Sequence, residues 1–147
     1  MIFHTNIEKD TLENNNYRKV ISTQSNIQLV LMSLKPKEEI GNEIHENIDQ
    51  FFRIEKGKAK VIINYNTQNE KEYKLKDGSV IIIPKGTYHN IINIGKKDLK
   101  FYTIYSPPNH APELVQLNKP EEQDGGYYNK YYEKYLKYKI KYLKSIK

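Results

Sequence analysis

The sequence predicts an all-β domain, closed into a barrel or a double-sheet jelly roll, followed by a basic helical tail. Short strand-like runs bounded by Gly, Asn, Asp or Pro recur through most of the chain, at the spacing of roughly 8 to 12 residues that is typical of sandwiches and barrels. The composition then changes across the Pro- and Gly-containing segment 119–126, which indicates a boundary. We therefore predict a domain at 1–118, a linker at 119–126 and a tail at 127–147.

The first expected strand is 26–34, in which Ile27, Leu29 and Leu31 alternate and so share one face. The runs that follow it are NEIHEN, DQFFRIEKG, KAKVIINYN, KEYKLKDG, SVIIIPKG, HNIINIG and LKFYTIYSPP. None of these runs shows helical periodicity. Closing such strands into a barrel or jelly roll removes the free edges and leaves an interior that can hold a small ligand.

Composition excludes several classes of site. At 147 residues, the chain has room for one core. It contains no cysteine, so a disulfide framework, a thiolate metal site and a cysteine nucleophile are all excluded, and any metal must bind nitrogen and oxygen ligands. The N-terminal residues lack the basic start and apolar run of a secretory signal, and no apolar run approaches the ~18 residues of a membrane span. We expect a cytoplasmic protein.

Polar side chains interrupt the predicted strands at a few positions. Glu43 and His45 are two residues apart and would point to the same face of an extended strand, while Gln50 opens the next strand. An unpaired carboxylate on an interior face would be very costly, and a metal ion is a counter-charge that these ligand types can bind. His89, from a distant strand, would be the fourth ligand. The alternative is a hydrogen-bonded polar core in which Gln50 bridges Glu43 and His45.

Two motifs resemble those of the cupin family. The second cupin motif is matched in full by Gly78, Pro84, Gly86, His89 and Asn93, separated by five, one, two and three residues. The first motif usually runs from His-x-His through four residues to Glu and six more to Gly. Its spacing is kept here by Glu43, His45, Gln50 and Gly57, although Glu43 replaces the first histidine and Gln50 replaces the glutamate.

The resemblance covers residues 6–116 and is closest to small single-domain bacterial cupins described as similar to mannose-6-phosphate isomerases. It implies a cupin double-stranded β-helix that binds one divalent transition metal, Mn, Fe, Co, Ni or Zn, through Glu43, His45, Gln50 and His89. It also implies a small-molecule ligand such as a sugar derivative, and a homodimer formed through edge strands. The expected function is a metal-dependent sugar or sugar-phosphate isomerase. An iron-dependent dioxygenase and a non-catalytic small-ligand-binding or virion protein are the alternatives.

Isomerase chemistry also needs a general base near the bound substrate. The tyrosines and the histidine expected at the barrel interior or its end are Tyr88, Tyr102, Tyr105 and His110, of which Tyr88, Tyr102 and His110 are the predicted catalytic residues. The predicted substrate-binding residues are Phe52, Arg53 and Lys85. The two cations would suit a phosphate group, although Lys and Arg are also the residues most often found at a surface.

The tail carries the whole net charge of +6, because residues 127–147 contain seven lysines and one acid. Tyr128, Tyr131, Tyr135, Tyr138 and Tyr142 are spaced as one stripe of a helix. Such a helix needs a surface to lie against, which could be its own body, a second copy, nucleic acid or an anionic surface. The predicted interaction residues are Tyr131, Tyr135, Lys137, Tyr138 and Lys141. The tail resembles the lysine and tyrosine repeats of giant DNA viruses of amoebae, which implies a host cytoplasm or a virion as the location.

Overall fold

The structure is a computed structural model that describes residues 1–120. The predicted tail and most of the predicted linker lie outside the described residues. The elements in chain order are α1 (Ile7–Glu13), β1 (Arg18–Thr23), β2 (Gln28–Leu34), β3 (Asp49–Lys56), β4 (Ala59–Ile63), β5 (Lys71–Leu75), β6 (Val80–Ile83), β7 (His89–Asn93), β8 (Leu99–Ser106) and β9 (Val115–Gln116). Among these described residues, no helix is long and apolar enough to cross a membrane.

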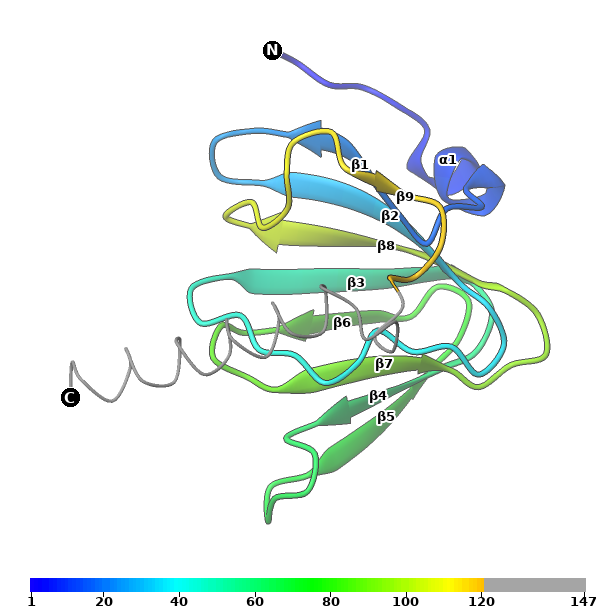
Figure 1. Ribbon diagram of the computed structural model, residues 1–147, viewed down its shortest axis with the longest axis vertical. Helices are drawn as coiled ribbons and strands as arrows, with labels where there is room; N and C mark the ends of the chain where they lie inside the picture. The colour runs from blue at the N-terminus through cyan, green and yellow to red at the C-terminus, as the bar shows by residue number, and fades with distance from the viewer. Residues whose placement is uncertain (121–147) are drawn as a thin grey trace.

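The strands form two antiparallel sheets (Figure 1), and buried residues of both sheets contribute to one core. The larger sheet has the order β6-β3-β8-β2-β1-β9, and the smaller one has the order β5-β4-β7. Consecutive strands such as β3 and β4 lie in different sheets, which is the connectivity of a jelly roll. The predicted all-β jelly roll is therefore confirmed.

The short helix α1 was not expected from the sequence. It begins at Asn6, whose side chain accepts a hydrogen bond from the backbone N–H of Lys9 at 3.0 Å, as an N-cap residue does. Two acidic residues in its first turn stabilise the helix, because they interact favourably with the positive end of the helix dipole. The helix contacts β2, β3 and β8, so it covers part of the larger sheet.

The pairing of the strands places the inward-pointing residues of the larger sheet in three rows that cross the strands. We call them the upper, middle and lower rows. The upper row contains Gln28, Tyr105, Gln50 and Ile83. The middle row contains Val20, Val30, Thr103, Phe52 and Ile81. The lower row contains Arg18, Met32, Phe101 and Ile54. Apolar residues of the middle and lower rows form much of the core. The upper row has polar side chains at three of its four positions, so a functional site is expected at this end of the barrel.

Gly57 connects β3 to β4 with a φ of 117°, a conformation that favours glycine. A Cβ atom there would lie 3.1 Å from Leu99 Cδ1 and 3.3 Å from Leu99 Cα. We expect Gly57→Ala to lower the free energy of unfolding by about 1–3 kcal/mol, measured by chemical denaturation. Gly78→Ala is the matched control, because φ is 84° but nothing lies within 4 Å of the added Cβ, so its loss should be smaller. Equal losses would show that the contact with Leu99 is unimportant.

Candidate metal centre

Three side chains from two distant parts of the sequence meet at the polar end of the barrel. Glu43 and His45 lie in the segment between β2 and β3, which runs alongside β7 (drawn in cyan in Figure 1). The backbone N–H of Glu43 donates to His89 O, and that of His89 donates to Glu43 O, both at 2.9 Å. This bridge brings the possible metal-binding atoms of Glu43, His45 and His89 within 4.8 Å of one another.

The His89 imidazole is oriented as a ligand would be. Its Nδ1 lies 3.0 Å from the carbonyl oxygen of Thr87, and because a carbonyl can only accept, Nδ1 carries the proton. In the neutral ring Nε2 then presents a lone pair. Nε2 is buried and has no hydrogen-bond partner in the part of the chain that the structure describes. A backbone carbonyl that holds the other ring nitrogen is the usual support of a metal-binding histidine.

Gln50 contributes a fourth possible donor atom. Its side-chain Nε2 donates to Thr103 Oγ1 at 2.9 Å, which leaves Oε1 for another partner. Oε1 is buried and, among residues 1–120, accepts no hydrogen bond. In these residues Gln50 does not bridge Glu43 and His45, so the polar core considered as an alternative is not formed in that way.

The Glu43 carboxylate supplies the negative charge of the cluster. Its Oε1 lies 3.4 Å from Nε2 of both His45 and His89. Burial raises the pKa of Glu43, but the two neighbouring imidazoles lower it by more, so the pKa lies well below its usual range. A carboxylate, two imidazoles and an amide oxygen are donors that Mn, Fe, Co, Ni and Zn all accept. The residues present therefore fit a divalent metal ion.

Tyr105 and His110 form a hydrogen-bonded pair beside this cluster. The Tyr105 hydroxyl lies 3.2 Å from His110 Nε2, and the Tyr105 ring stands edge-on to that of His45, with 5.7 Å between their centroids. Burial raises the pKa of Tyr105 and, together with the charge of Arg18, lowers the pKa of His110 to about 4. At neutral pH Tyr105 is therefore protonated and His110 is neutral.

Gln28 holds His110 in place, a role that sequence reasoning missed. Its Oε1 accepts the backbone N–H groups of Asn109 and His110 at 3.0 and 2.9 Å, and its Nε2 donates to the His110 carbonyl at 2.9 Å. Gln28 is fully buried. The sequence does place Gln28 on the same face of the strand as Val30 and Met32. That pattern could have indicated a buried amide, which requires hydrogen-bond partners.

Both predicted catalytic tyrosines lie away from the cluster. Tyr102 alternates with Phe101 and Thr103, so its side chain is on the outer face of the larger sheet, where it stacks on Phe51 at 6.0 Å. Tyr88 precedes β7 and is 42% exposed. Of the three predicted catalytic residues, the structure brings only His110 near the cluster.

The predicted substrate-binding residues are also dispersed. Phe52 is buried in the core, with its ring centroid 6.0 Å from that of His89. It packs against a residue of the site but has almost no exposed surface for a substrate to contact. Arg53 lies on the outer face and forms an ion pair with Glu55. Lys85 is exposed beyond the end of β6. Neither cation is placed to hold a phosphate group inside the barrel.

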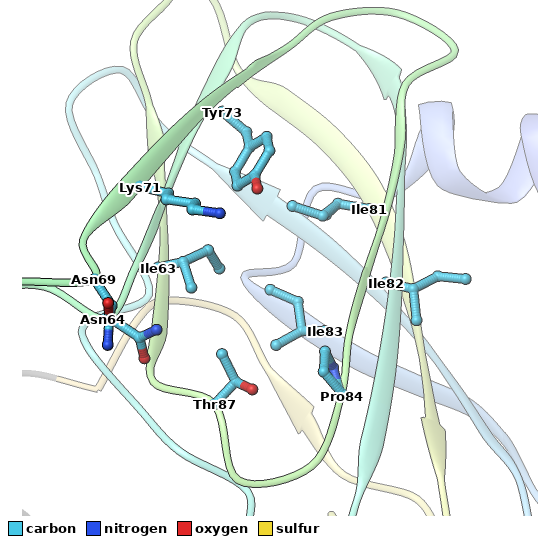
Figure 2. Close-up of a pocket in the computed structure, with 10 residues that line it drawn as sticks. All are labelled: Ile63, Asn64, Asn69, Lys71, Tyr73, Ile81, Ile82, Ile83, Pro84 and Thr87. Carbon is cyan, nitrogen blue, oxygen red and sulfur yellow. The ribbon is translucent and has the colours of Figure 1, made fainter.

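A groove of about 510 Å³ opens where β5 and β6 separate (Figure 2). Its lining includes Ile63, which is the register partner of His89, and Ile83, which is the partner of Gln50. The groove is therefore at the level of the cluster along the barrel. Figure 2 shows Lys71 and Tyr73 directed into it from β5. Its volume lies in the range of ~300–1,000 Å³ typical of small-molecule sites.

The cupin domain model matches residues 30–105. The chain belongs to the cupin family. An uncharacterized protein of Acanthamoeba polyphaga mimivirus is 46% identical over 149 residues, covering 97% of this cupin and 89% of the viral protein. YrkC of Bacillus subtilis is 44% identical over 81% of this chain, which spans only 64% of YrkC. A crystal structure from Bacillus halodurans has a TM-score of 0.76 at 38% identity, covering 80% of this chain and 89% of that one. The expected cupin fold is thus confirmed.

Proposed function

We propose that this cupin binds one divalent transition metal through Glu43, His45, Gln50 and His89, and that it moves a proton on a small metal-bound molecule, as sugar and sugar-phosphate isomerases do. One observation carries the proposal: three buried atoms, His45 Nε2, Gln50 Oε1 and His89 Nε2, make no hydrogen bond within residues 1–120, and the two imidazole nitrogens both lie 3.4 Å from Glu43 Oε1. An unsatisfied buried polar atom costs about 1–3 kcal/mol. One metal ion would satisfy all three.

Other residues of this chain would hold a proton near the substrate and provide space for it. A bound divalent metal would polarise an oxygen of the substrate. Tyr105 holds a proton next to the cluster, and His110, neutral because its pKa is lowered to about 4, lies 3.2 Å from that hydroxyl and can accept its hydrogen bond. His110 is only partly buried, so it connects the buried hydroxyl with solvent. The mostly apolar groove of Figure 2, whose lining includes the register partners of His89 and Gln50, offers space for the rest of a small molecule.

Replacing Tyr105 by phenylalanine tests the proton-transfer step. Purified protein with measured metal content is incubated with mannose 6-phosphate and a panel of other sugars and sugar phosphates, and isomerised product is quantified. We expect Tyr105→Phe to reduce turnover by about 10²-fold or more with unchanged metal content. Tyr102→Phe, on the outer face, is the matched control and should change turnover by less than about twofold. Full activity of Tyr105→Phe would contradict the assigned role.

A specific observation favours an iron-dependent dioxygenase as the second candidate. Glu43, His45 and His89 are two histidines and one carboxylate, the ligand set of the non-haem Fe(II) oxygenases. An oxygen electrode with Fe(II)-loaded protein and the same panel separates the two candidates. Consumption of dioxygen favours the oxygenase, and isomerisation without consumption favours the isomerase. Metal binding with neither reaction would favour a non-catalytic small-ligand-binding protein.

The proposal includes a homodimer and a role for residues 127–147. β6 is an edge strand with Val80 and Ile82 exposed at 45% and 65%, and a second copy could cover it. The tail is proposed to contribute to self-association, with nucleic acid as the weaker alternative. Light scattering and nucleic-acid binding are compared between the full chain and a chain ending at Gly126. If both quantities were unchanged, both tail roles would be wrong. The proposed location is a host cytoplasm or a virion.

A further inference from the structure

The chain contains two arginines, and they occupy opposite faces of the larger sheet. Arg53 points outward, half exposed, and pairs with Glu55. Arg18 starts β1 and is the register partner of Met32, which is fully buried on the inner face. Cross-strand partners point to the same face, so Arg18 also points inward. It is 9% exposed, an unusual degree of burial for an arginine.

Within residues 1–120, the contacts of Arg18 are all with uncharged groups. Nη1 donates to the side-chain Oε1 of Gln116 at 2.6 Å, and the guanidinium lies 5.1 Å from the centroid of the Tyr17 ring. Nε is buried without a hydrogen-bond partner in the described part of the chain. No carboxylate of residues 1–120 forms an ion pair with it. A buried cation with only neutral partners is costly, and an anion would stabilise it.

The charge of Arg18 acts within the proposed site. Burial is the main reason that the pKa of His110 is lowered, and the next is the positive charge of Arg18. The pKa of Tyr105 is raised by burial and then by the negative charge of Glu43, whereas the positive charge of Arg18 lowers it. Tyr105 is hydrogen-bonded to His110 and packs against His45. Within residues 1–120, the barrel interior therefore contains the carboxylate of Glu43 and a cation without an ion-pair partner, and both charges influence Tyr105.

We infer that Arg18 is the anion-binding residue of this cupin, and that its ligand is a small organic acid or phosphate ester. The anionic group would bind Arg18 through the Nε edge, which Gln116 does not use. The planar guanidinium matches a carboxylate or a phosphate with two parallel hydrogen bonds. The inference rests on the proposed metal-dependent function and names its substrate class, which a sugar phosphate and a sugar acid both satisfy.

Paired substitutions of the two arginines test the inference. Wild type, Arg18→Gln and Arg53→Gln are titrated by calorimetry at low ionic strength with glucose 6-phosphate, glucuronate and neutral glucose, and the metal content of each protein is measured separately. We expect wild type and Arg53→Gln to bind one or both anions more tightly than glucose. Arg18→Gln should lose at least about tenfold in affinity for the anion, the loss expected when a charge-assisted hydrogen bond is removed, with unchanged metal content. The tighter anion identifies the ligand as phosphate or carboxylate.

Thermal unfolding shows whether Arg18 has a structural role instead. Without added anion, Arg18→Gln should unfold at the wild-type temperature or higher, because it removes an unpaired buried charge. Added inorganic phosphate or glucuronate should then raise the unfolding temperature of wild type and Arg53→Gln but not of Arg18→Gln. Anion binding by Arg18→Gln equal to wild type, or no binding by wild type, would overturn the inference. A wild-type protein that holds no metal yet binds the anions through Arg18 would instead refute the proposed function alone.

Discussion

Replacing His89 by alanine is expected to abolish metal binding. The substitution removes one of the two imidazole donors, Nε2, and leaves a carboxylate, one imidazole and an amide as donors. Loss of a supporting residue alone typically weakens a metal site by about 10- to 100-fold, and loss of a ligand weakens it by more. Metal per chain, measured by elemental mass spectrometry after gel filtration, should fall from about one in wild type to below about 0.1 in His89→Ala.

The two histidines outside the proposed ligand set provide matched controls for this measurement. His4 lies in the exposed N-terminal segment, and His110 is hydrogen-bonded to Tyr105 outside the cluster. His4→Ala and His110→Ala should both retain the wild-type metal content. If His89→Ala kept its metal, or if His4→Ala lost it equally, the assignment of the cluster as the metal site would be wrong.

Truncating Phe101 to alanine is expected to cause the largest loss of stability. Its side chain is fully buried, lies between Met32 and Ile54 in the lower row, and packs 6.0 Å from the ring of Phe52. Removing a buried phenylalanine ring costs about 3–5 kcal/mol through lost burial and the cavity left behind. Because domains are stable by only about 5–15 kcal/mol, urea denaturation should show a large shift of the midpoint.

Ile82→Ala is the matched control for the core substitution. Ile82 is apolar and lies on β6 of the same sheet, but it points outward and is 65% exposed. Its truncation should change the free energy of unfolding by less than about 0.5 kcal/mol. Similar losses for Phe101→Ala and Ile82→Ala would contradict the assignment of the inner face.

Motif spacing and strand alternation predicted the centre of the candidate site. The turns around Gly78 and Gly86 and the position of His89 are local features, so they can be read from a short stretch of sequence. The alternation of Gln50 with Phe52 likewise predicted a shared face, and both residues are buried on the inner face. These expectations depended only on the twofold period of a strand.

The choice of inner face in β2 was beyond local reasoning. Leu29 and Leu31 do share a face, as expected, but it is the outer one, and the inner face carries Gln28, Val30 and Met32. Both faces of this strand carry buried apolar residues, because Leu31 on the outer face is only 3% exposed. A strand covered on both sides does not show which face is inner.

The positions of Tyr105 and Arg18 depend on long-range strand pairing, so they could not be predicted from local sequence. In β8, Tyr105 points inward with Phe101, and Tyr102 points outward, a distinction that requires knowledge of which residues face the core. Arg18 is placed on the inner face by its pairing with Met32 of β2, and further along the same pair of strands the register shifts between Val20 and Ser22. Such a bulge cannot be located from one sequence, since it depends on the partner strand.

X-ray absorption spectroscopy of the metal-loaded wild-type protein tests the central claim most directly. If Glu43, His45, Gln50 and His89 bind the metal, the spectrum should show a first shell of nitrogen and oxygen at about 2.0–2.2 Å. It should also show the outer scattering of two imidazole rings, and His89→Ala should lose one ring or all bound metal. A spectrum with oxygen ligands alone and no imidazole scattering would contradict the claim, because it would place the metal away from His45 and His89.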